Sequence, residues 1–124
     1  MRHISRQEIF ELHESLIKRY GGCSGCADPD KINALLSRVF NYAYYDGVED
    51  VFALAAMYFV AIARGHVFVD GNKRTALAVC LLFLKRNNVS IHHVPSLEQM
   101  AVDVAQGLVS ASDLANYLRK NYSN

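Results

Sequence analysis

Residues 51–84 read VFALAAMYFVAIARGHVFVDGNKRTALAVCLLFL, and this stretch decides the fold. It has an apolar run at each end, residues 51–63 and residues 76–84, and neither run leaves a polar face. Runs of this kind are typical of helices that are buried on all sides. We therefore expect two helices at the centre of a bundle, joined by a polar loop.

Nine residues between the two runs, from His66 to Arg74, contain five side chains that can bind charge or move a proton. Placing so many polar groups between apolar helices costs free energy of desolvation, so the cluster indicates a function. A helix that begins just after Gly71 would present free amide groups and the positive end of its dipole. Gly71 would let a ligand approach the backbone closely, and Phe68 should turn into the core and anchor the loop. The sequence therefore predicts an anion site.

Each polar side chain of this loop has a candidate role. Asn72, Lys73 and Arg74 would supply an amide, an ammonium and a guanidinium group, a set that suits a polyphosphate. Asp70 is well placed to hold Mg²⁺ that bridges phosphate oxygens. His66 could take a proton from an attacking hydroxyl group. Singly, each residue has a structural explanation, but cations at a helix N-terminus oppose its dipole unless an anion binds there.

Length and composition describe one ordinary domain. The chain of 124 residues can bury one core, and no linker divides it, so we expect a single domain over residues 1–124. A formal net charge of +1 gives no general attraction to nucleic acid or to an anionic membrane. The longest apolar run, of about 13 residues, is shorter than the roughly 18 to 20 needed to span a bilayer. With no secretory signal, the sequence predicts a cytoplasmic protein.

Capping and turn residues predict about six helices. The two central helices should run from about residue 49 to Arg64, with Gly65 as a left-handed cap, and from Asn72 to residues 87–88. Four more are expected over residues 6–19 after Ser5, residues 29–40 after Asp28, residues 97–106 after Ser96 and residues 111–122 after Ser110, with residues 89–95 extended or in a loop. The prediction is an all-α fold around a central buried helix pair.

Residues 41–50 read NYAYYDGVED and have two interpretations. An Asp-Gly pair between short aromatic and β-branched runs is typical of a β-hairpin, which here would form an exposed flap. A simple loop between two helices fits the same residues. The sequence alone does not separate the two interpretations.

Three cysteines are present, and two of them are close in sequence. Cys23 and Cys26 have the spacing of half a zinc site or of a redox pair, but no second CxxC follows and no βαβ pattern surrounds them. We interpret them as reduced thiols in a loop. Cys80 lies in an apolar run and should be a small core residue.

The polar loop also resembles a family signature. His66-x-Phe68-x-Asp70-Gly71-Asn72-Lys73-Arg74 is similar to HxFx(D/E)GNxRxxR, the motif of the Fic/Doc family. The resemblance covers essentially the whole chain, and the shared stretches are MRHIS at residues 1–5, RYGG at residues 19–22, ARGH at residues 63–66 and KRTAL at residues 73–77. Within the family, the chain resembles the Doc (death on curing) toxins of phage toxin–antitoxin modules.

This resemblance implies an all-α Fic fold, a nucleoside triphosphate donor such as ATP, Mg²⁺, and transfer to a hydroxyl side chain of a target protein. His66 would be the base and Asp70 the Mg²⁺ ligand. Asn72, Lys73 and Arg74 would bind the phosphates.

Two positions depart from the general motif. Lys73 stands where a second glycine is usual, and Leu77 stands where the final arginine is usual. Doc toxins share both departures, so the resemblance implies a kinase that acts on elongation factor Tu, inhibits translation and is neutralised by a partner antitoxin. Residues 41–50 would be the flap that holds the target segment as an added β-strand. The alternatives are a Fic-type AMP transferase and a non-enzymatic helical binding module, and the near-neutral charge disfavours a nucleic-acid-binding module.

Overall fold

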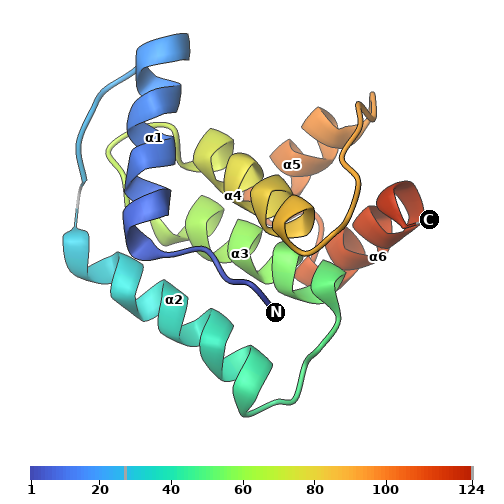
Figure 1. The fold of residues 1–124 in the computed structure, drawn as a ribbon. Coiled ribbons are helices and arrows are strands. Elements are labelled where there is room, and N and C mark those ends of the chain that lie inside the picture. The colour runs from blue at the N-terminus through green and yellow to red at the C-terminus, as the bar shows by residue number, and fades with distance from the viewer. Residues whose placement is uncertain (27, 124) are drawn as a thin grey trace.

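The computed structural model describes residues 1–26 and 28–123, and the chain folds into helices (Figure 1). These are α1 (Arg6–Tyr20), α2 (Pro29–Tyr44), α3 (Val51–Gly65), α4 (Asn72–Arg86), α5 (Leu97–Ala105) and α6 (Ala111–Tyr122). Six helices within the described residues confirm the all-α prediction. An isolated bridge between Cys26 and Phe68 is the one β-type pairing in that part of the chain.

Helix α3 lies at the centre of the bundle and contacts α2, α4, α5 and α6, while α1 packs against α4 and α2 (Figure 1). The largest core side chains come from the two central helices. Tyr58, Phe59 and Ile62 of α3, and Phe83 and Leu84 of α4, are each at most 1% exposed. Burial of each such side chain stabilises the fold by about 1.5–3 kcal/mol. The two apolar runs therefore form the core, as predicted, and they fix both ends of the polar loop.

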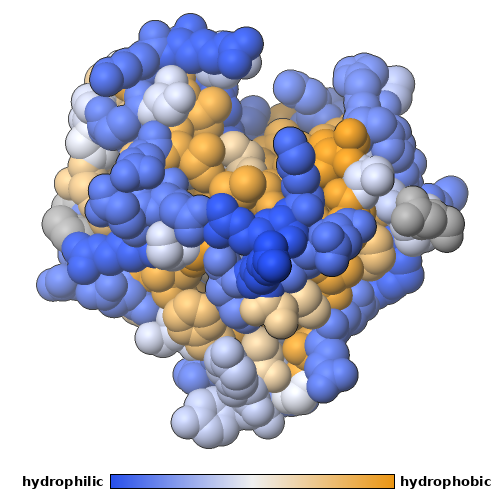
Figure 2. Space-filling model, viewed as in Figure 1, coloured by the Kyte–Doolittle hydropathy of each residue, from blue (hydrophilic) through white to orange (hydrophobic). Residues whose placement is uncertain are grey.

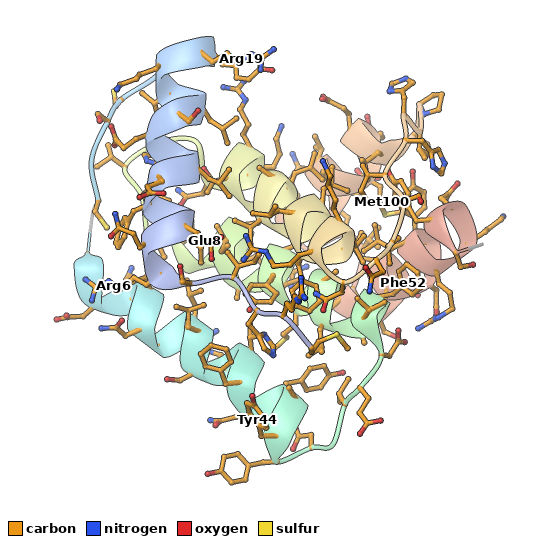
Figure 3. The ribbon with its side chains drawn as sticks, in the orientation of Figure 1. Arg6, Glu8, Arg19, Tyr44, Phe52 and Met100 are labelled. Atoms are coloured by element: carbon orange, nitrogen blue, oxygen red, sulfur yellow. The ribbon has the colours of Figure 1, made fainter. Side chains whose placement is uncertain are left out.

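Figure 2 shows hydrophilic side chains over much of one face, with apolar side chains visible toward its centre. Large exposed apolar side chains include Tyr44 at the end of α2 (Figure 3) and Tyr45, the cap residue that follows it. None of the helices that the structure describes is long and apolar enough to cross a membrane.

Three of the four predicted serine and aspartate caps are confirmed. The confirmed caps are Ser5, which accepts the Glu8 N–H, Asp28, which accepts the Asp30 N–H, and Ser110, which accepts the Asp113 N–H. The prediction for Ser96 is wrong, because its backbone is helical at φ −82° and ψ −5°. Its hydroxyl instead hydrogen-bonds the Tyr117 hydroxyl at 2.6 Å. A cap needs an extended backbone to aim its side chain at the first amides, and Ser96 lacks one.

The hairpin interpretation of residues 41–50 is wrong. Helix α2 continues to Tyr44, and the Tyr45 N–H closes its last turn on the Asn41 carbonyl at 2.8 Å. Gly47, at φ 69°, then turns the chain toward α3. Because helical hydrogen bonds already satisfy the first amides of this segment, they are not free to pair as a strand. The loop interpretation holds for the remainder of the segment.

The residues before α1 tie this helix to the core. The Tyr58 hydroxyl accepts the Ile4 N–H at 3.1 Å and hydrogen-bonds His3 Nδ1 at 2.8 Å. Arg86, at the end of α4, forms an ion pair with Glu8 of α1 and donates to the His3 carbonyl at 3.1 Å. Helix α1 is therefore held against α4, and it carries groups that support the polar loop.

Candidate functional site

The loop between α3 and α4 is anchored on helix α1. The Phe68 side chain is 3% exposed, as predicted for the anchor, and its ring stacks on the His13 imidazole with centroids 3.7 Å apart and planes 5° apart. His13 is 1% exposed, and its Nε2–H donates to the Asp70 carbonyl at 2.7 Å. A carbonyl can only accept, so this bond also fixes the proton on Nε2. One buried histidine thus holds the loop at two points.

The segment that follows α1 runs beside the same loop. Cys26 forms the bridge with Phe68, and its thiol donates to the Val67 carbonyl at 3.3 Å. The Cys23 N–H donates to Asp70 Oδ2 at 3.1 Å. Both cysteines are free thiols, and the described residues contain no group of three side chains that could hold a metal ion by themselves. The CxxC pair therefore contacts the loop through backbone groups and a weak thiol bond.

Asn72 shapes the loop from within. Its side-chain oxygen accepts the Phe68 N–H at 3.0 Å, and its amide nitrogen donates to the Phe68 carbonyl at 2.9 Å. These two bonds close the loop on itself, and phosphate binding by the Asn72 side chain stays a prediction. Its backbone N–H, at the start of α4, remains a candidate phosphate donor.

Asp70 presents an oriented and exposed carboxylate. Oδ1 accepts the Gly71 N–H at 2.8 Å, and Oδ2 accepts the Cys23 N–H at 3.1 Å. A Cβ atom at Gly22 would lie 2.6 Å from Oδ2, so a side chain at this position would displace the carboxylate. Mg²⁺ is usually bound through one or two carboxylates together with water and substrate phosphates. The donor set here fits a Mg²⁺ ion that arrives with a nucleotide.

A cavity of about 550 Å³, which we call the phosphate cavity, lies at the N-terminus of α4. It is lined by Tyr20, Gly21, Gly22 and residues 69–74. No side chain caps α4, and its N-cap, Gly71, has φ 78°, so the first amides of the helix are available to a ligand. Lys73 and Arg74 are exposed here, and the Arg74 guanidinium carbon lies 4.7 Å from the centroid of the Tyr20 ring. Free amides and two cations form a site suited to a polyphosphate.

His66 lies outside the phosphate cavity. It takes the left-handed cap position of α3, at φ 52° and ψ 41°, whereas Gly65 stays within the helix, so the prediction of Gly65 as the cap is wrong. A left-handed backbone costs a non-glycine residue about 1–2 kcal/mol, and such strain is concentrated at functional positions. His66 is exposed and lines a second cavity of about 510 Å³ that is bordered by α2 and α3. The loop therefore contributes to two cavities.

The structure brings five of the six predicted site residues together around the phosphate cavity, and it places His66 at the second cavity. Sequence reasoning missed His13, Tyr20 and Gly22. His13 carried a weak signal, because it follows Ile9 by four residues and so falls on the apolar stripe of α1. Tyr20 and Gly22 looked like the end of a helix, and only the tertiary structure shows that they form a wall of the site.

Two comparisons with known proteins bear on this site. The sequence model of the Fic/DOC family matches residues 3–84, a range that includes the entire loop and most of α4. The chain is also 45% identical over 124 residues to a protein of Escherichia phage P1 described as "Protein kinase doc". That alignment covers 100% of this chain and 98% of the phage protein.

Proposed function

The chain belongs to the Fic/DOC family, and from this premise we propose that it is a Doc-like protein kinase. It transfers the γ-phosphate of ATP to a hydroxyl side chain of a target protein. The observation that carries the proposal is the phosphate cavity at the uncapped start of α4, with Lys73 and Arg74 beside it. The phage relative, which is aligned over its whole length, is itself named a protein kinase.

The proposed phosphate-binding groups have different roles, which follow from their chemistry. The first amides of α4, next to Gly71, donate to phosphate oxygens, and the helix dipole favours their negative charge. Lys73 and Arg74 neutralise the remaining charge of the triphosphate. Asp70 is the residue that would hold a Mg²⁺ ion brought in with ATP, and that ion would offset negative charge on the phosphates. The two N–H groups that Asp70 accepts keep its carboxylate at the edge of the cavity.

His66 is the proposed general base. The target hydroxyl gives its proton to the imidazole while its oxygen forms a bond to the γ-phosphorus, and the bond from that phosphorus to the ADP oxygen breaks. The transfer needs the hydroxyl and the leaving oxygen in line. The left-handed backbone at His66 and the anchored Phe68 hold the base at a fixed place on the loop.

Two side chains favour transfer of phosphate over transfer of AMP. Lys73 fills with a cation the space that a glycine would leave open, and it is exposed at the phosphate cavity. Leu77, one turn later, is partly buried against the core and offers nothing to the outer phosphates. The triphosphate is therefore expected to bind with its γ-phosphate toward His66.

Labelled ATP tests this reaction directly. The purified chain is incubated with a translation-factor target, Mg²⁺, and ATP labelled at either the α or the γ phosphorus. Label should reach the target only from the γ position, and His66→Ala should lower the rate by on the order of 10² to 10⁴ because the base is lost. Label that arrives only from the α position would establish AMP transfer instead. A His66→Ala rate equal to that of the unaltered chain would remove His66 from the role of base.

The biological setting follows from the same proposal. We expect a cytoplasmic toxin whose target is a translation factor similar to elongation factor Tu, so that phosphorylation inhibits translation. A separate antitoxin protein would silence the toxin. We expect this antitoxin to dock a helix on the bundle.

A further inference from the structure

The second cavity, which we call the α2–α3 groove, has a positively charged lining. Its polar lining includes Lys31 and Arg38 of α2, Arg64 of α3, and His66, and no carboxylate lines it. Lys31 and Arg38 are both exposed, and neither forms an ion pair within residues 1–26 and 28–123. Unpaired cations that share one concave surface create a positive potential that attracts an anionic group.

Arg64 is fixed in place, unlike the two cations of α2. Its Nε–H and one terminal N–H donate to the Val104 carbonyl at 3.0 and 2.7 Å, and the same terminal nitrogen donates to the Val109 carbonyl at 3.1 Å. The guanidinium charge is not neutralised by these neutral carbonyls. Arg64 therefore contributes a fixed positive charge to the lining that also includes His66.

The distance between the two cations of α2 suits an extended peptide and not a single ion. Lys31 and Arg38 are separated by seven residues, which is roughly 10 Å along a helix axis and about the length of three residues of extended chain. Leu35 lies between them and contributes an apolar surface to the groove, as does Val60 of α3. The groove thus offers an apolar floor with cations along it. Among the described residues that line it there is no phenylalanine, tyrosine or tryptophan ring on which a nucleic-acid base could stack.

We propose that the α2–α3 groove binds an acidic segment of the target protein and presents its hydroxyl side chain to His66. This inference rests on the proposed kinase function. ATP would occupy the phosphate cavity, so the hydroxyl must reach the base from elsewhere, and the groove is the cavity that His66 lines. Acidic side chains on both sides of the hydroxyl pair with Lys31 and Arg38. The choice of target is then set by Lys31 and Arg38, which lie outside the motif of residues 66–74.

The test measures peptide binding, which needs no turnover. One nine-residue fluorescent peptide has a single threonine flanked by two glutamates three residues apart, and its matched partner has glutamines at those two positions. We expect the glutamate peptide to bind more tightly by roughly three- to tenfold, the range for two solvent-exposed ion pairs. The double variant Lys31→Gln/Arg38→Gln should abolish this preference. The matched double variant Lys85→Gln/Lys120→Gln removes the same charge from exposed positions outside the groove and should keep it.

Every outcome decides the proposal. Equal binding of the two peptides, or a preference that survives Lys31→Gln/Arg38→Gln, overturns it. Displacement of the glutamate peptide by a non-hydrolysable ATP analogue also overturns it, because the peptide would then occupy the phosphate cavity. Thermal unfolding of the double variant provides the fold control. Failure of the γ-label experiment with an intact peptide preference would count against the kinase and not against the groove.

Discussion

Gly22 controls the position of the proposed magnesium ligand at the scale of single residues. It follows Gly21 at the end of α1, and both have positive φ values, 118° and 84°. A Cβ atom at Gly22 would meet Asp70 Oδ2 at 2.6 Å, whereas nothing lies within 4 Å of one at Gly21. Both glycines therefore have a backbone conformation that other residues adopt poorly, but only at Gly22 would a side chain also meet the Asp70 carboxylate.

Gly22→Ala and Gly21→Ala form a matched pair of variants. Each should lower the free energy of unfolding by about 1 kcal/mol because alanine tolerates a positive φ poorly. Only Gly22→Ala should also weaken binding of MgATP, by roughly tenfold, because the added methyl group displaces the Asp70 carboxylate. Calorimetric titration with a non-hydrolysable ATP analogue and Mg²⁺ measures the difference. Equal affinities of the two variants for the analogue with Mg²⁺ would show that its binding does not depend on the observed position of the Asp70 carboxylate.

The side chains of the site could be predicted from sequence more readily than their surroundings. The polar cluster after α3 stood out because apolar runs flank it, and Phe68 fell in the core as expected. The double hydrogen bond of Asn72 to Phe68 could not be foreseen, because an amide serves a ligand and a loop equally well. His13 acts on Asp70 across 57 residues, and no local pattern indicates such a partner.

At the scale of helices, the contact between α1 and α4 includes one charged link. Glu8 and Arg86 form an ion pair, and this hydrogen-bonded guanidinium, followed by the Ser5 N–H, lowers the pKa of Glu8 to about 2. The ordinary value is 4.5, so the folded pKa is depressed. The pair therefore stabilises the fold above about pH 4.5, and this contribution is lost as the pH falls toward 2. Figure 3 shows Glu8 on the side of α1 that faces α4.

Glu8→Gln should reveal this dependence in urea unfolding between pH 7 and pH 2. Glutamine can still accept the Ser5 N–H of the capping box, so the change isolates the charge. At pH 7 the variant should be less stable by on the order of 1 kcal/mol, discounted for partial exposure, and the difference should vanish near pH 2. Glu11→Gln removes an exposed charge from the same helix and serves as the control. A Glu8→Gln difference that does not change with pH would exclude the ion pair as its cause.

Helix ends were predictable where the cap is local and not where a distant residue competes. Ser5, Asp28 and Ser110 cap through amides two or three residues away, so their sequence context contains the whole interaction. Ser96 has a partner 21 residues along the chain, the Tyr117 hydroxyl, and that contact was invisible. The length of α2 was underestimated because Asp46-Gly47 can end a helix as well as turn a hairpin.

Considered as a whole molecule, the bundle is arranged around the loop. The family match ends at residue 84, yet α5 and the turn after it hold Arg64 beside the α2–α3 groove through two carbonyls. Helix α1, which precedes the central pair in the chain, supports the loop between α3 and α4 through the hydrogen bond of His13 to the Asp70 carbonyl. Within the described residues, helices that come before and after the central pair in the chain therefore both contribute supporting contacts.

Expression of the chain in a bacterial host tests the toxin proposal at this scale. The unaltered protein should arrest growth after induction, and His66→Ala, expressed to the same level, should not, because the base is removed while the fold remains. Growth curves and measured protein abundance give the readout. Healthy growth with abundant soluble unaltered protein would refute toxicity. Co-expression of a cognate antitoxin should restore growth to cells that contain the unaltered chain.

The two cavities to which the loop contributes also bear on the kinetic scheme of the proposed reaction. If ATP enters the phosphate cavity and the target segment enters the α2–α3 groove, the two ligands contact different sets of lining residues. Binding can then follow either sequence, and both ligands must be present together before the hydroxyl reaches the phosphorus. From these two proposals we expect a ternary complex with random addition, in which the phosphate passes directly from donor to acceptor without resting on the enzyme.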